Sequence, residues 1–174
     1  MSEALILARL EVLEAESAIR RLVARYFAIC DDLGPDTPFE ELGDLFTEDA
    51  LWEGRGRYAK AFGRYEGRRA IVAMIRSYCE PQPHFAMTGH FFGAEDIRVE
   101  GDMAKGQWMM LQTSDYADGR SDFRAARITM RLAFDGARWR IAHFLTQNVF
   151  SRQVERWNDD LSIPVPEGGS GAEQ

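Results

Sequence analysis

The apolar positions in the first third of the chain recur at helical spacing. From Ile19 to Cys30 they fall three and four residues apart, while arginines occupy the opposite side, and this pattern predicts an amphipathic helix. Leu10 and Leu13 indicate an earlier helical segment. The helix is expected to end within residues 31–35, because the Gly and Pro there stop helical propagation.

A second helix is expected after this turn. Thr37 at the N-cap, Pro38 at the first helical position and Glu40 at the third form a capping box. Apolar residues at helical spacing follow as far as Phe46. Thr37 is therefore predicted to cap a helix that buries this apolar face.

The next part of the chain combines short elements with a polar connection. A short strand is expected at residues 50–52, followed by a polar, glycine-rich stretch at residues 53–67. A third helix is predicted for residues 68–78, because apolar residues recur there at helical spacing. Two prolines beyond it end this helix.

From His84 onward the hydrophobic period changes to two, which is the period of a strand with one buried face. Four strands are predicted, at residues 84–99, 104–116, 122–134 and 138–150. The Asp135-Gly136 pair between the last two is a hairpin signal. Consecutive strands are therefore expected to pair antiparallel.

Helices followed by an antiparallel meander indicate an α+β fold, with helices on one face of the sheet. A strongly curved, mostly antiparallel sheet with helices across its open side encloses a cone, which suits a small-molecule pocket. The length of 174 residues fits a single domain. That domain is expected to cover residues 1–162, and residues 163–174, rich in Gly and Pro, are expected to form a flexible C-terminal tail.

Composition and charge narrow the partners. The chain has 28 acidic and 21 basic residues, giving a formal net charge of −7, whereas nucleic-acid-binding domains usually carry a basic excess. Neither nucleic acid nor a membrane is therefore expected as a partner. No segment has the pattern of a signal peptide or a membrane span. Cys30 and Cys79 lie on apolar helix faces, where packing is the simplest role, and a cytoplasmic location is expected.

Metal and cofactor chemistry find little support in the sequence. The three histidines, His84, His90 and His143, do not show metal-ligand spacing. The glycines in residues 54–56 lack the third glycine of a dinucleotide-binding loop. We therefore expect no metal and no cofactor, which leaves acid–base chemistry.

The candidates for acid–base chemistry begin at the end of the first helix. Asp31 follows Tyr26 by five residues and continues the buried side of the helix, where a carboxylate opposes the helix dipole and loses hydration. The alternative is that Asp31 caps the following turn. His90, at an aromatic-rich strand start, is either a functional group or a satisfied core histidine. His84 is expected at the surface, while His143 shares the strand parity of apolar neighbours and is expected to point inward.

The second long strand is apolar on both faces. One face carries Trp108, Met110, Gln112 and Ser114. This face is expected to form core or to wall a pocket. Met109 and Leu111 on the opposite face imply a second burial, so a homo-oligomer, a dimer or a trimer, is expected.

Several segments together carry a resemblance to a known family. They are residues 18–31, 45–50, 65–68, 88–90, 106–108 and 136–141. On these segments, spread over residues 10–152, the chain resembles the SnoaL-like branch of the NTF2-like superfamily, which has a cystatin-like fold. This fold hosts many chemistries, so the resemblance specifies the fold more closely than the function.

Within that superfamily the chain is similar to small cofactor-free dehydratases, such as the bile acid 7α-dehydratase and scytalone dehydratase. The resemblance implies that Asp31 and His90 form a pair inside the cone, accompanied by Tyr26. The substrate-specific groups differ. Asn148 stands where the bile acid enzyme has an arginine, and a position near Ser114 replaces a second histidine of scytalone dehydratase.

The resulting hypothesis is a cofactor-independent lyase (dehydratase) or isomerase for a hydrophobic hydroxy-carbonyl compound, polycyclic or steroid-like. Tyr26, Asp31 and His90 are its expected catalytic residues. Substrate contacts are expected from Trp108, Met110, Gln112, His143 and Asn148. The alternative is a non-catalytic ligand-binding or oligomerisation module, like the β subunit of aromatic-ring dioxygenases. An open apolar cavity with Asp31 and His90 in contact favours the enzyme, whereas a filled cone favours the module.

Overall fold

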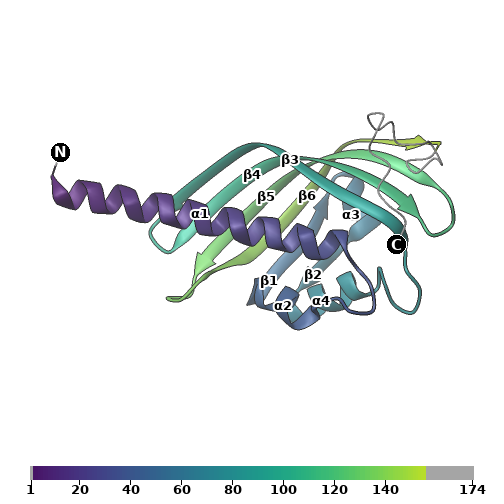
Figure 1. Cartoon of the computed structure of the whole chain (residues 1–174), viewed down its shortest axis with the longest axis horizontal. Helices are drawn as coiled ribbons and strands as arrows, with labels where there is room; N and C mark the ends of the chain where they lie inside the picture. The colour runs from purple at the N-terminus through teal and green to yellow at the C-terminus, as the bar shows by residue number, and fades with distance from the viewer. Residues whose placement is uncertain (1, 156–174) are drawn as a thin grey trace, which may run out of the picture.

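The computed structural model describes residues 2–155 and shows helices packed on a curved six-stranded sheet (Figure 1). The helices are α1 (Glu3–Asp31), α2 (Phe39–Asp44), α3 (Arg57–Phe62) and α4 (Arg68–Arg76). The strands are β1 (Phe46–Arg55), β2 (Arg64–Glu66), β3 (Phe85–Glu100), β4 (Met103–Tyr116), β5 (Ser121–Phe134) and β6 (Trp139–Val154). The α+β class is confirmed. The predicted tail at residues 163–174 lies outside the described residues.

The sheet has the order β2-β1-β6-β5-β4-β3. The four long strands β3 to β6 pair antiparallel in sequence order, as the hairpin pattern predicts. The first strand, β1, joins β6 in parallel, so the sheet is mixed. On β4 and β5 buried residues alternate with more exposed ones along most of each strand, and the buried face packs against the helices.

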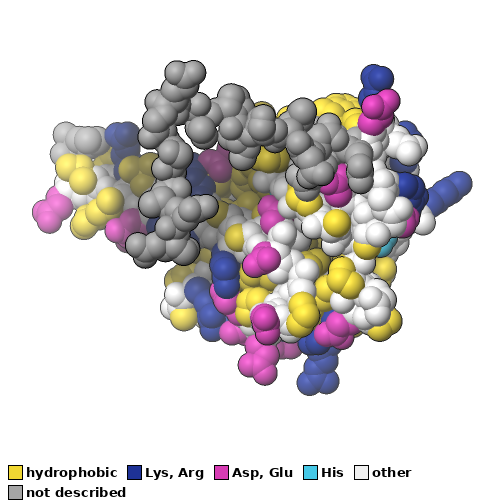
Figure 2. All heavy atoms as spheres, turned by 45° about the vertical axis from the view of Figure 1, so that its right-hand side comes forward, with side chains coloured by type: hydrophobic (Ala, Val, Ile, Leu, Met, Phe, Trp, Pro, Cys, Tyr) yellow, Lys and Arg dark blue, Asp and Glu magenta, His cyan; other side chains and the backbone are white. Residues whose placement is uncertain are grey.

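The first helix is one continuous element of 29 residues that lies across the sheet, while its N-terminal part extends past the sheet edge (Figure 1). Only its second half contributes buried residues, from Ile19 onward. Ser2 caps it by accepting a hydrogen bond from the backbone N–H of Leu5 at 3.4 Å. The projecting part exposes several hydrophobic side chains (Figure 2). The helix ends at Asp31, inside the predicted turn.

The capping box predicted at Thr37 is wrong. The Thr37 hydroxyl faces back along the chain, accepting from Gly34 N–H at 2.7 Å and donating to the Gly34 carbonyl at 2.8 Å. It therefore closes a turn of residues 34–37 rather than capping a helix. Pro38 occupies the N-cap of α2, without a side-chain cap.

The polar, glycine-rich stretch at residues 53–67 contains regular secondary structure, which the sequence pattern did not predict. It contains α3 and β2, and β2 pairs antiparallel with β1. Gly54 allows α3 to approach β1, because a Cβ at this position would lie 2.3 Å from the carbonyl oxygen of Tyr58. Gly54 is therefore needed for the close approach of two backbone segments. Composition alone would have suggested that it belongs to a loop.

A bulge in the β5–β6 pairing corrects the prediction for His143. The register shifts between Arg131 and Leu132, which reverses the facing of β6 beyond Ile141. Ile141 and Phe144 are both buried, and His143 instead contacts Glu53 Oε1 through Nε2 at 3.0 Å. The inward direction predicted from strand parity is therefore wrong for this residue.

No helix within residues 2–155 is long and apolar enough to cross a bilayer. The same residues contain no group of three or more His, Cys, Asp or Glu side chains placed to hold a metal ion.

Candidate active site

A cavity of about 460 Å³ opens between the end of α1, the helices α3 and α4, and the inner face of the sheet. Most of its walls are apolar or aromatic. Among the lining residues are Tyr26, Phe27, Trp52, Met110, Ile128 and Phe144. Trp52 and Phe144 stack with ring centroids 5.3 Å apart and planes 4° from parallel. The core is therefore not filled on this side, and the cavity has the walls of a small-molecule site.

Asp31 and His90 meet at the wall of this cavity. Asp31 Oδ1 contacts His90 Nδ1 in a short hydrogen bond, and Asp31 Oδ2 accepts from the backbone N–H of His90 at 3.1 Å. The helix end supplies the carboxylate, and the start of β3 supplies the imidazole. The side chain of His90 is 12% exposed and that of Asp31 is 29% exposed, so the imidazole is largely shielded from bulk water.

The pairing fixes how the imidazole can act. A carboxylate accepts, so Nδ1 carries the proton and the other nitrogen, Nε2, carries a lone pair. Nε2 makes no hydrogen bond with any described residue, and His90 lines the cavity. Phe27 packs on the ring, with centroids 5.1 Å apart. The arrangement is that of a general base whose tautomer is set by a carboxylate.

Tyr26 lines the same cavity from the preceding turn of α1. Its hydroxyl accepts a hydrogen bond from Trp52 Nε1 at 3.2 Å. Burial raises the pKa of Tyr26 well above its usual value, so the phenol stays protonated and serves as a donor. Burial also raises the pKa of the neighbouring Cys30 thiol to about 12, which keeps this thiol neutral.

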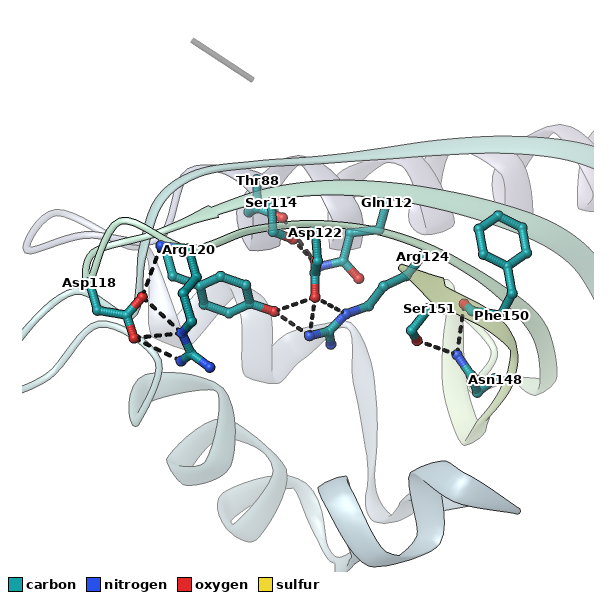
Figure 3. A network of polar contacts seen from close by, with 11 residues as sticks. Thr88, Gln112, Ser114, Asp118, Arg120, Asp122, Arg124, Asn148, Phe150 and Ser151 are labelled. Carbon is teal, nitrogen blue, oxygen red and sulfur yellow. Dashed lines mark hydrogen bonds and ion pairs between the residues drawn. The ribbon is translucent and has the colours of Figure 1, made fainter. Parts of the chain in front are cut away.

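Gln112 lies beside His90 in the strand register and also lines the cavity. Its amide Nε2 donates to Thr88 Oγ1 at 3.3 Å and to Ser114 Oγ at 3.1 Å (Figure 3). These two bonds orient the amide. Met110 lines the cavity as well, so two of the five substrate-contact predictions fall on cavity walls.

The other three predicted substrate contacts lie away from the cavity. Trp108 is 3% exposed and donates through Nε1 to Glu95 Oε2 at 3.0 Å. Asn148 donates to the Phe150 carbonyl at 2.9 Å and to Ser151 Oγ at 2.8 Å (Figure 3). His143 is held by Glu53, as described above. None of these three side chains lines the cavity.

A second polar group in the cavity was missed by the sequence reasoning. Arg124 on β5 lines the cavity, with Nε donating to Asp122 Oδ2 at 2.5 Å and Nη2 contacting the Tyr116 hydroxyl (Figure 3). Tyr116 in turn donates to Asp122 Oδ2 at 2.9 Å. Arg124 and Asp122 share a face of a predicted strand, and this spacing of two opposite charges was the available signal. His84, at the cavity rim, is exposed as predicted.

Comparison with known proteins adds the family. The model of the SnoaL-like domain matches residues 11–144, most of the chain. The chain belongs to the SnoaL-like family. None of the curated proteins compared with it matches.

Several proteins of known structure share this fold. An NTF2-like protein with a cystatin-like fold from Novosphingobium aromaticivorans is 25% identical, with a TM-score of 0.65, and the match covers 85% of this chain and 90% of that one. A candidate scytalone dehydratase from the same species is 18% identical, with a TM-score of 0.67 and coverage of 92% and 97%. The hexachlorocyclohexane dehydrochlorinase LinA-type3 from Novosphingobium barchaimii is 16% identical, with a TM-score of 0.68 and coverage of 88% and 97%. At these identities the last two likenesses establish the fold.

Proposed function

We propose that this protein is a cofactor-independent lyase or isomerase that acts on a hydrophobic, polycyclic hydroxy-carbonyl compound. The observation that carries the proposal is that His90 lines a largely apolar cavity while Asp31 holds its Nδ1 and leaves Nε2 without a hydrogen-bond partner among the described residues. A base next to a carbonyl-bearing substrate needs only a fixed tautomer and a shielded site to act at neutral pH.

In the proposed reaction His90 Nε2 removes a proton from the carbon next to the carbonyl. Asp31 stabilises the imidazolium that results. The electrons of the C–H bond form a double bond, and the hydroxyl on the next carbon leaves as water with a proton supplied by Tyr26. The proton held by His90 returns to the phenol through solvent. In an isomerisation, His90 would instead return the proton to another carbon of the same substrate.

The cavity and the structural neighbours support this function over a binding module. A non-catalytic module with a filled cone would bond His90 into its core, whereas this cavity is open, His90 lines it, and Nε2 of His90 has no hydrogen-bond partner among the described residues. The names of two neighbours, a scytalone dehydratase and a dehydrochlorinase, both denote eliminations. The aromatic walls match a flat, polycyclic substrate.

Two further assignments belong to the proposal. Exposed apolar side chains on the first helix and on the outer sheet face, such as Leu10 and Leu111, support a homo-oligomer. Cys30 and Cys79 are both free thiols, which supports a reducing, cytoplasmic location.

The experiment is turnover of a panel of polycyclic and steroid-like hydroxy-ketones in D₂O. NMR follows deuterium entering next to the carbonyl, and mass spectrometry follows the loss of water. We expect the wild type to do both with at least one compound, and His90→Gln to do neither while its circular dichroism is unchanged. His143→Gln, outside the cavity, is the matched control and is expected to keep activity. Full activity of His90→Gln would end the proposal.

A further inference from the structure

Polar side chains cross the inner face of the sheet in two rows. In the first row, His90 on β3 pairs with Gln112 on β4, which pairs with Arg124 on β5. In the second, Thr88 pairs with Ser114, which pairs with Asp122. Directly paired residues share a face of the sheet, so His90 and Arg124 lie two strand spacings apart, about 10 Å at the usual separation.

Arg124 has one donor group to spare. Its Nε and Nη2 are taken by Asp122 and by the Tyr116 hydroxyl (Figure 3). Its Nη1 makes no hydrogen bond with any residue in the described range 2–155, although the side chain is only 22% exposed and lines the cavity. A guanidinium held at two corners presents its third corner in a fixed direction. This corner suits an oxygen of a bound molecule.

The charge around Arg124 is already balanced. Asp122, with a side chain only 13% exposed, pairs with Arg124. The nearby Arg120 is paired with Asp118 at 2.7 Å. An anionic ligand here would be repelled by Asp122 about as strongly as it is attracted by Arg124. An uncharged acceptor oxygen meets no such opposition and still gains a charge-assisted hydrogen bond.

We propose that Arg124 and Gln112 form a specificity site for an uncharged oxygen, a ketone or a hydroxyl, on the ring of the substrate remote from the reacting carbon. The site deepens the proposed function and rests on it for the reacting end. Gln112, whose amide nitrogen is already bonded to Thr88 and Ser114, offers its carbonyl oxygen between the two ends and accepts from a substrate hydroxyl. Arg124 Nη1 donates to the distant oxygen.

This spacing would determine which carbon of the substrate reaches the base. A substrate held by its oxygen at Arg124, two strands away from His90, presents one particular carbon to the base. A compound without the remote oxygen fits the apolar walls but slides along them. Arg124 is therefore expected to determine which position reacts, in addition to how tightly the substrate binds.

The test uses three tricyclic probes of similar shape with the full chain. Fluorene has no acceptor, 9-fluorenone has an uncharged one, and fluorene-9-carboxylate has an anionic one. In calorimetric titration, the wild type is expected to bind 9-fluorenone with higher affinity than fluorene or fluorene-9-carboxylate. Arg124→Lys keeps the charge opposite Asp122 but loses the forked donors. This variant is expected to bind 9-fluorenone about tenfold more weakly, which corresponds to the loss of one good hydrogen bond. Its affinity for fluorene is expected to be unchanged.

Asp122→Asn gives an independent measurement. Removing the balancing carboxylate leaves the Arg124 charge uncompensated, so fluorene-9-carboxylate is expected to gain about tenfold in affinity. A wild type that prefers the carboxylate, or an Arg124→Lys variant with an unchanged ratio of 9-fluorenone to fluorene affinity, would overturn the proposal. Binding to His90→Gln separates the two proposals, because loss of turnover there leaves the probe ranking unchanged.

Discussion

The carboxylate of Asp31, the last residue of α1, binds both the ring and the backbone of His90, 59 residues later on β3. The two bonds use different oxygens, so the carboxylate cannot rotate to serve one without losing the other. This connection joins the end of the long helix to the start of the sheet. It also sets the tautomer of His90, which lines the largely apolar cavity.

Asp31→Asn is expected to reverse this tautomer. The backbone N–H of His90 needs an acceptor, so the amide oxygen would stay there and the NH₂ group would face Nδ1. Nδ1 would then accept, and the proton would move to Nε2, which could no longer act as a base. We expect a loss of about 10²–10⁴-fold in kcat with little change in KM. Steady-state kinetics on the substrate found by the panel checks this.

Asp32→Asn is the matched control for this change. Asp32 is the next residue and is exposed; within residues 2–155 its one hydrogen bond runs from its backbone N–H to the Ile29 carbonyl at 3.3 Å. Its variant is expected to keep wild-type kinetics. Equal losses in the two variants would mean that a charge at the helix end, and not the bond to His90, matters.

The sequence predicted the elements well and the turns between them less well. Helical spacing and strand alternation located α4, the four long strands and the end of α1 to within a few residues, because burial on one side imposes those periods. The earlier helical segment expected at Leu10 and Leu13 is part of α1, which begins at Glu3. Thr37 fits the sequence pattern of a helix cap, yet its hydroxyl forms hydrogen bonds with the backbone of Gly34. Local patterns do not decide between two nearby backbone partners for one side chain.

The site residues that could be predicted are those marked by the family resemblance or by the alternation along a strand. Asp31 and His90 were found through a resemblance that spans both segments, and their contact is in the structure. Arg124 was missed because its place beside Gln112 depends on the register of two strands, which the sequence does not state. His143 was placed on the wrong face because the bulge between Arg131 and Leu132 in the β5–β6 register reverses the facing of the β6 residues that follow it.

Alkaline pH is expected to destabilise the protein through Cys30. Burial raises the pKa of this thiol from its ordinary value of 9 to about 12, so the unfolded chain ionises first as pH rises. The stability that the neutral thiol contributes is thus complete below pH 9 and is lost between pH 9 and 12. Tyr26, whose pKa is also raised by burial, acts in the same direction. Guanidinium unfolding at pH 8, 10 and 11 measures the decline.

Cys30→Ala isolates the contribution of the thiol. This variant is expected to show a shallower decline of unfolding free energy between pH 9 and 11, although it is less stable at pH 8 through lost packing. Identical slopes for the variant and the wild type would contradict the assignment to Cys30.

Glu95 is expected to stabilise the fold by accepting hydrogen bonds from two side chains, one on β4 and one on α1. Its Oε2 accepts from the indole of Trp108 at 3.0 Å and its Oε1 from Arg20 on α1 at 2.6 Å. Glu95→Ala leaves the buried indole N–H without its acceptor, which costs about 1–3 kcal/mol. Glu95→Gln keeps a carbonyl acceptor and loses only a partly exposed ion pair, which costs less than about 1 kcal/mol. Chemical unfolding of both variants tests this order, and equal losses would mean that the ion pair dominates.

The projecting half of α1 is expected to bind a second copy of the chain. Every described side chain from Ser2 to Glu14 is exposed, yet this stretch carries six large hydrophobic residues with exposures of 38% to 59% (Figure 2). An isolated helical end of this length gains little stability from propensity alone, so burial against a partner would be its main support. Leu10 and Leu13, three residues apart, lie on one side of it.

Leu10→Glu combined with Leu13→Glu should therefore dissociate the oligomer. Light scattering after size-exclusion chromatography is expected to give a multiple of the 19.8 kDa chain mass for the wild type and a smaller species for the double variant. Replacing Glu11 and Glu14, which are exposed on the same stretch, with Gln is the control and should leave the mass unchanged. Because this end of α1 lies far from Asp31 along the helix, the double variant is expected to keep its fold and its cavity. A wild type that elutes as a monomer at all concentrations would contradict the assignment of this helix face.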